Sequence, residues 1–115
     1  MFTLNRRIEV EKLIIESAIR TAIAQGFVLR RVHHEDAVNV ATVEQALAEA
    51  FVCDDAHIIF DNPLGPDGKS VGSAWIHAVY GNSGWDVISD YTTNLDDVIK
   101  AIDPLVTQFE TEDSQ

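Results

Sequence analysis

The sequence is short of cysteine, of positive charge and of long apolar runs: its 115 residues include one cysteine and eight lysines and arginines. The single cysteine, Cys53, cannot form an internal disulfide, and its neighbours do not give the paired Cys or His spacing of a zinc site. No apolar run approaches the roughly 20 residues of a membrane span, and residues 1–7 lack the apolar core of a signal peptide. We therefore expect one cytoplasmic domain without membrane contact.

Carboxylates are abundant, and 19 of them give a formal net charge of -11 at pH 7. Residues 1–32 hold six basic and three acidic side chains, whereas residues 33–115 hold two basic and sixteen acidic ones. An acidic surface is repelled by phosphate backbones, so direct binding of nucleic acid is disfavoured and a basic partner is favoured. The alternative is that the charge only keeps a small protein soluble.

Hydrophobic periodicity predicts a first helix over residues 5–25, ended by Gly26, because glycine adopts the left-handed C-cap conformation without steric cost. The apolar stripe of this helix is broad, which favours packing against more than one neighbour or an additional contact with a partner subunit. Two strands follow at residues 27–32 and 37–41. We interpret residues 33–36 between them as a solvated turn, because four adjacent side chains do not converge on one metal ion.

The middle of the chain predicts a second helix and three strands. Thr42 and Gln45 have the spacing of a capping box for a helix that ends near residue 52. The strands are expected at residues 56–60, 72–80 and 85–92. The turn-forming residues 81–84 join the last two strands as a hairpin.

A last helix is expected from Asn94 onward, with a kink or restart at Pro104, where Asp103 is a local cap. Residues 1–110 then form a single α+β domain, and residues 111–115 are expected to be a disordered acidic tail. The element order αββαβββα predicts a mainly antiparallel sheet of about five strands, with about three helices packed on one face.

Motifs of catalytic or cofactor chemistry are missing from the sequence. Gly68-Lys69-Ser70 resembles the end of a phosphate-binding loop, but Pro63 stands where that motif needs a glycine, and no helix start follows. No nucleophile elbow or zinc-hydrolase helix is present. We therefore expect no cofactor, no metal site and no catalytic residue, and we expect that the protein is not an enzyme.

The most informative group of side chains lies on the predicted hairpin. If its strands pair without a bulge, one side packs beneath the helices and the other is exposed. The exposed side then carries the candidate binding residues Trp75, His77, Asp86 and Asp90, with His77 opposite Ile88 and Trp75 opposite Asp90. Carboxylates, a flat indole and a titratable imidazole together suit a cationic or aromatic group. The alternative is an ordinary half-exposed sheet face.

Two stretches, YGNSGWDVISDYT at residues 80–92 and LNRRIEVEK at residues 4–12, resemble a group of short uncharacterised acidic proteins that bacteriophages, plasmids and other mobile elements encode. The resemblance implies a bacterial or phage setting and supplies no catalytic motif or ligand. Small acidic proteins in that setting often bind a host or defence factor, and some present carboxylates where a nucleic acid presents phosphates.

We therefore expect a non-enzymatic accessory or inhibitor-type interaction protein. Its acidic surface binds a protein partner that is basic or that itself binds nucleic acid. Two alternatives stay open. One is a small-ligand-binding module that uses the exposed face of the 72–92 hairpin. The other is a structural homodimer, in which the apolar stripe and arginines of the first helix meet acidic elements of the second subunit.

Overall fold

Residues 3–63, 67–68, 72–81 and 87–113 are described by the computed structural model of the chain. They form helices, a 3₁₀-helix and strands in the order α1 (Leu4–Ala24), β1 (Val28–His33), β2 (Ala37–Asn39), α2 (Val43–Ala50), β3 (Asp55–Asp61), β4 (Ser73–Val79), β5 (Ile88–Tyr91), η1 (Thr93–Leu95) and α3 (Asp96–Asp113). The strands make one antiparallel sheet in the order β2-β1-β3-β4-β5. The α+β class and the element order predicted from the sequence are confirmed.

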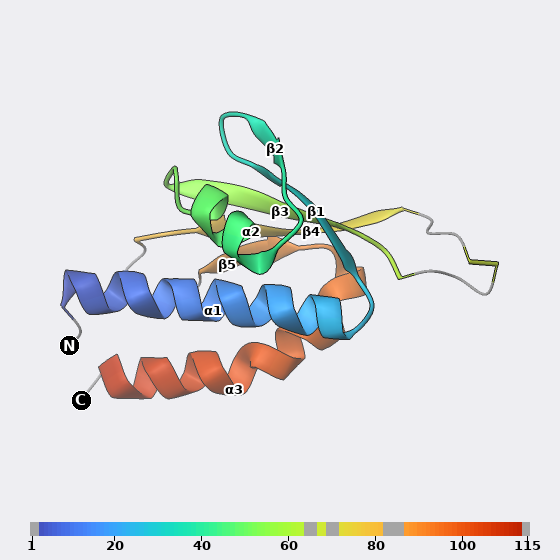
Figure 1. Cartoon of the computed structure of the whole chain (residues 1–115). Coiled ribbons are helices and arrows are strands. Elements are labelled where there is room, and N and C mark those ends of the chain that lie inside the picture. The colour runs from blue at the N-terminus through green and yellow to red at the C-terminus, as the bar shows by residue number, and fades with distance from the viewer. Residues whose placement is uncertain (1–2, 64–66, 69–71, 82–86, 114–115) are drawn as a thin grey trace.

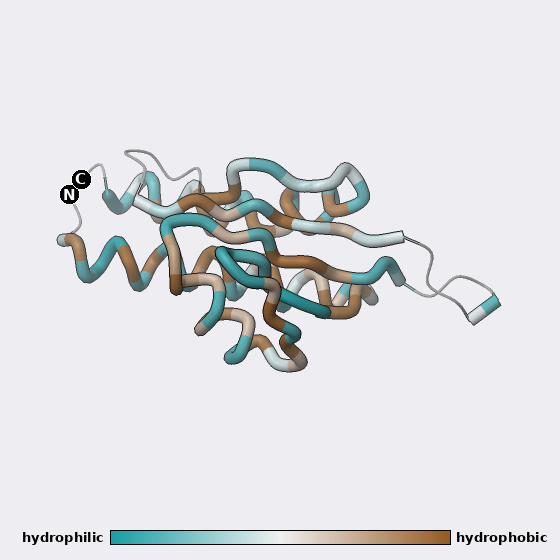
Figure 2. Tube along the Cα trace, turned by 90° about the horizontal axis from the view of Figure 1, so that it is seen from above, coloured by the Kyte–Doolittle hydropathy of each residue, from teal (hydrophilic) through white to brown (hydrophobic). Residues whose placement is uncertain are grey.

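The α-helices lie on one face of the sheet, and Figure 1 shows α1 and α3 side by side beneath it. One hydrophobic core fills the space between the sheet and these helices. Its largest fully buried side chains are Phe60, Ile14, Ile15, Ile19, Ile58, Ile76, Leu95, Val10, Val32, Val87 and Val98. The opposite face of the sheet is open in the view from above (Figure 2). The molecule therefore buries one side of its sheet and exposes the other.

Helix α1 has the ends and the neighbours that its sequence predicts. Thr3 caps its start, where the hydroxyl accepts a hydrogen bond from the backbone N–H of Arg6 at 3.2 Å. Gly26 follows its end with a φ of 99°, a conformation that glycine adopts without strain. The broad apolar stripe packs against α2, α3 and β1. The expectation of more than one neighbour is thus confirmed.

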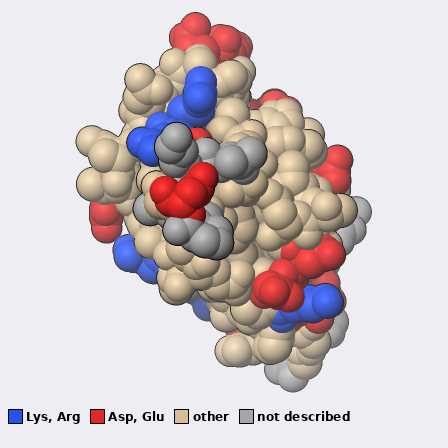
Figure 3. All heavy atoms as spheres, turned by 90° about the vertical axis from the view of Figure 1, so that its right-hand side faces the viewer, with Lys and Arg blue, Asp and Glu red and all other residues tan. Residues whose placement is uncertain are grey.

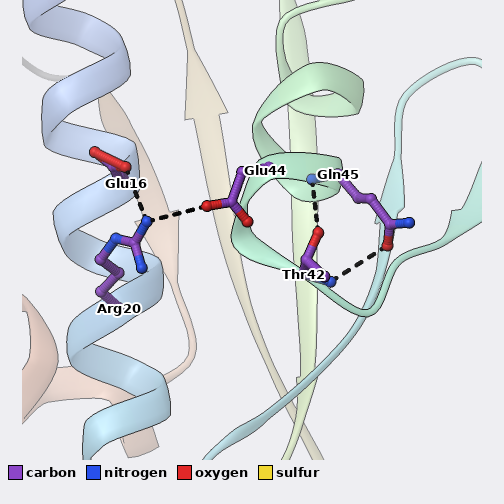
Figure 4. A network of polar contacts seen from close by, with 5 residues as sticks. All are labelled: Glu16, Arg20, Thr42, Glu44 and Gln45. Carbon is purple, nitrogen blue, oxygen red and sulfur yellow. Dashed lines mark hydrogen bonds and ion pairs between the residues drawn. The ribbon is translucent and has the colours of Figure 1, made fainter.

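Helix α2 begins with the predicted capping box (Figure 4). The Thr42 hydroxyl accepts from the backbone N–H of Gln45 at 3.1 Å, and the Gln45 side chain accepts from the backbone N–H of Thr42 at 3.3 Å. Val43, Ala46 and Ala50 are its buried residues. The helix ends at Ala50, two residues before the predicted end.

Replacing Thr42 by alanine is expected to lower the free energy of unfolding by about 1 kcal/mol, because the first turn of α2 loses its side-chain acceptor. Thr42 is exposed, so the change removes little packing. Urea unfolding measures the effect, and Thr42→Ser is the control that keeps the hydroxyl. Equal unfolding midpoints for the alanine variant and the natural chain would contradict a stabilising cap.

Helix α3 differs from its prediction. It is continuous from Asp96 to Asp113 with Pro104 inside it, so the restart predicted at Asp103 is wrong. Val98, Ile102 and Phe109 are buried along it, and this shared packing holds the helix together across the proline. Residues 111–113 belong to the predicted disordered tail, but they are helical. Across the described residues no helix is long and apolar enough to cross a membrane.

Asn94 has a different role from the predicted helix cap. It lies within the 3₁₀-helix η1, before α3. Its amide donates to the side-chain oxygen of Asn62 at 2.6 Å and to the carbonyl of Ser73 at 3.4 Å. Asn94 therefore links the approach to α3 to the adjoining ends of β3 and β4.

Candidate functional site

The open face of the sheet is formed by every second residue of its strands. Strands β3 and β4 each alternate between buried and partly exposed side chains, as residues that point to opposite faces must. The buried set contacts the helical core, whereas the side chains on the other side include His57, Ile59, Trp75, His77 and Val79. These five are only partly exposed. Ring contacts of His57 with His77 and with Trp75 account for part of this burial.

Three histidines cross the open face in one line, and we call His33, His57 and His77 the histidine row. His33 of β1 is the cross-strand partner of His57 in β3, and His57 is the partner of His77 in β4. The rings of His57 and His77 are stacked, with centroids 4.2 Å apart and planes 4° apart. Asp90 of β5 is the next residue in register, beside His77. Four adjacent strands therefore contribute one continuous polar line.

Trp75 lies beside the histidine row on the same face. Its ring meets His57 edge to face, with centroids 5.4 Å apart and planes at 68°. Its direct cross-strand partner is Ile59. The backbone N–H of Trp75 donates to the Thr92 hydroxyl at 3.2 Å, which holds this end of β4 beside the segment after β5. The indole of Trp75 therefore offers a flat apolar surface next to the titratable rings of the histidine row.

Three of the four residues predicted for the site share this face. Trp75, His77 and Asp90 lie on it, while Asp86 lies outside the described residues. The predicted register is wrong, because His77 pairs with Asp90 and Ala78 pairs with Ile88. A bulge between His77 and Ala78 causes the difference, since one extra residue shifts the pairing. Asp90 consequently lies directly opposite His77.

Sequence reasoning missed His33, His57 and Asp55. The alternating pattern of the strand could have placed His57 on the exposed face, because it is a polar residue between the buried Ala56 and Ile58. Asp55, two positions before His57, is on the same face by the same rule. His33 belongs to the predicted turn at residues 33–36, whereas in the structure it is the last residue of β1.

The carboxylates at the edge of the histidine row act on its charge. Nε2 of His77 lies 3.1 Å from Oδ2 of Asp55, whose side chain is 59% exposed. Partial burial and the neighbouring His77 lower the pKa of His57 below its ordinary value, and Asp55 opposes this less strongly. His57 is therefore neutral at pH 7.

The prediction of a solvated turn at residues 33–36 holds only for Glu35 and Asp36, which are exposed. Nε2 of His33 is buried and has no hydrogen-bond partner. The side chain of His34 is 7% exposed, and its Nε2 lies 3.0 Å from Oε2 of Glu49. In the described parts of the chain, no group of three or more His, Cys, Asp or Glu residues is arranged to hold a metal ion.

Some basic residues of the first third of the chain form ion pairs with later carboxylates. These pairs join Arg6 to Glu9, Arg20 to Glu16 and Glu44, and Arg30 to Asp61. Figure 4 shows Arg20 between its two partners. Glu44 and Asp61 belong to the acidic part after residue 32, so some of the basic charge of the first third of the chain is used within the fold.

The surface carboxylates are scattered at the end of the molecule shown in Figure 3. The red groups there lie in several separate patches, some of them beside blue groups, and do not form one continuous acidic face. Helix α3 is the most acidic element, with Asp96, Asp97, Asp103, Glu110, Glu112 and Asp113 against Lys100. This distribution suits solubility better than a phosphate-like array at that end.

A groove of about 560 Å³ lies on the helical side, between α1 and α3. Leu13, Ala24, Leu105 and Phe109 supply much of its apolar lining, and Leu13 is 42% exposed. The groove contains the part of the α1 stripe that neither the sheet nor α3 covers. It is separate from the open face of the sheet.

Comparison with known proteins gives no relative: no protein-family model, no curated protein and no solved structure matches this chain.

Proposed function

We propose that this chain is a non-enzymatic accessory or inhibitor-type protein of a mobile element, and that it binds a basic protein partner through the open face of its sheet. The mobile-element setting rests on the sequence resemblance. The observation that carries the binding proposal is the group formed by Trp75, Asp55 and Asp90. It joins a partly exposed indole to two carboxylates on one uncovered face.

The charge on the part of the open face formed by β3, β4 and β5 supports a cationic partner. Strands β3, β4 and β5 contain no lysine or arginine. Asp61 is neutralised by Arg30, whose Nε lies 2.6 Å from Oδ2, whereas Asp55 contacts only the imidazole of His77 in the ion pairs found. Asp90 accepts a hydrogen bond from the backbone N–H of Tyr91 at 2.8 Å. At neutral pH the negative charge of Asp55 and Asp90 is therefore available to a partner.

The shape of the site supports a macromolecular partner. Small ligands usually bind in concave sites, whereas a sheet face offers a broad surface. Aromatic residues often contribute much of the binding energy of such surfaces, and Trp75 supplies the aromatic side chain of this group.

Affinity capture from a bacterial host lysate at low ionic strength tests this function. Trp75→Ala is expected to weaken capture of a specific partner about tenfold or more, because an aromatic anchor is lost. The Asp55→Asn/Asp90→Asn double variant is expected to reduce it and to weaken its salt dependence. The matched control, Asp97→Asn/Glu110→Gln, removes two exposed charges from α3 and should bind normally. Equal recovery with all of these variants would contradict the assignment to the open face.

The small-ligand alternative has its own test. A thermal-shift screen with amines, nucleosides and divalent ions measures ligand binding without a protein partner. A shift that disappears in Trp75→Ala, together with no specific capture from lysate, would favour the ligand module over the interaction protein.

A further inference from the structure

The histidine row places titratable groups where they change the charge of the proposed docking face. His57 is the central member, and the charged or titratable groups that act on it come from each neighbouring strand. They are His33 from β1, Asp55 from β3, His77 from β4 and Asp90 from β5. At neutral pH the two carboxylates dominate this group. Protonation of His57 and His77 supplies two positive charges that offset them.

We propose that the histidine row is a proton-operated release device, which lets the open face hold a basic partner at neutral pH and weakens that binding on mild acidification. This inference rests on the proposed function, because it concerns the regulation of the same face. The carboxylates and the lysines of a partner keep their charges between about pH 7.5 and pH 5.5, so histidines are the side chains that respond in this range.

The stacking of His57 on His77 couples their titration. Two imidazolium rings at a centroid distance of 4.2 Å repel each other, so the second proton binds less readily than the first. Asp55 and Asp90 favour protonation of His57, while partial burial and the neighbouring His77 and His33 oppose it. The open face therefore takes up protons in steps that describe the coupled histidines together, and a step cannot be assigned to one residue.

The first experiment needs no partner. NMR titration of the ring protons, with each histidine assigned by its glutamine variant, follows protonation directly. His57 is expected to titrate at a more acidic pH than an ordinary histidine, and His77→Gln is expected to raise its midpoint, because a like charge is removed. His34→Gln is the control, since His34 contacts Glu49 and is outside the row. An unchanged His57 midpoint in His77→Gln would overturn the coupling.

The second experiment uses decalysine as a cationic probe, with amide shift mapping and calorimetry at pH 7.5 and 5.5. Decalysine is expected to perturb β3, β4 and β5 at pH 7.5 and to bind about threefold more weakly at pH 5.5, as offsetting one surface charge pair implies. The His57→Gln/His77→Gln variant should bind equally at both pH values. Asp55→Asn/Asp90→Asn should bind weakly at both.

The outcomes separate the two proposals. Decalysine that binds the open face with the same affinity at both pH values overturns the release device and leaves the binding surface intact. Decalysine that perturbs only α3, at any pH, counts against the open face itself. A pH response that survives in His57→Gln/His77→Gln would place the switch elsewhere and overturn this inference.

Discussion

Replacing Ile58 by alanine is expected to lower the free energy of unfolding by about 3 kcal/mol, whereas the same replacement at the adjacent Ile59 is expected to cost about 1 kcal/mol or less. Ile58 is fully buried and lies in register between Val32 of β1 and Ile76 of β4, so truncation leaves a cavity in the core. Ile59 points to the open face and is only partly buried. The two variants make the same chemical change one residue apart.

Urea unfolding of both variants gives the comparison, and circular dichroism confirms that each is folded. Equal losses at Ile58 and Ile59 would show that both sides of β3 are buried, which is incompatible with an open sheet face. The expected difference leaves Ile59→Ala stable enough for binding measurements. That variant then serves as a mild perturbation beside Trp75, its cross-strand partner.

Replacing Glu11 by alanine is expected to lower the free energy of unfolding by about 2 kcal/mol, as is typical for a lost hydrogen bond to a charged group. Glu11 is 3% exposed, and its carboxylate accepts a hydrogen bond from the backbone N–H of Gly81 at 2.9 Å. This bond joins α1 to the segment after β4. Burial and the nearby carboxylates of Glu11 and Asp55 raise the pKa of Tyr80, so its hydroxyl stays protonated.

Glu9→Ala is the matched control, because Glu9 lies on the same helix in an exposed pair with Arg6. Its removal is expected to change stability by no more than about 0.5 kcal/mol. Glu11→Gln keeps an acceptor oxygen without the charge and should fall between the two. Chemical denaturation of the three variants provides the measurement. A loss in Glu11→Ala no larger than in Glu9→Ala would mean that the buried contact does not stabilise the fold.

The candidate site was predictable only in part. Alternation along a strand is local, so Trp75 and His77 could be assigned to one face from their spacing alone. The partner opposite each residue could not, because the bulge after His77 is a local departure from regular pairing that alternation does not encode. Asp90 was therefore placed opposite Trp75 and lies opposite His77 instead.

The histidine row could not be predicted from the sequence for a different reason. His33, His57 and His77 are far apart in the sequence and meet because β1, β3 and β4 are adjacent in the sheet. Strand order depends on which apolar surfaces pack together and on the cost of closing the intervening loops. No pattern within one strand carries that information.

The α+β class, the order of the elements, the capping box of α2 and the acidity of the chain can all be predicted from the sequence. Each of these follows from composition or from interactions between residues close together in the chain. The open face of the sheet, the stacking of imidazoles on it, and the pairing of basic side chains with carboxylates can be found only in the folded molecule. Those features depend on contacts between distant segments, and they exist only after the core has packed.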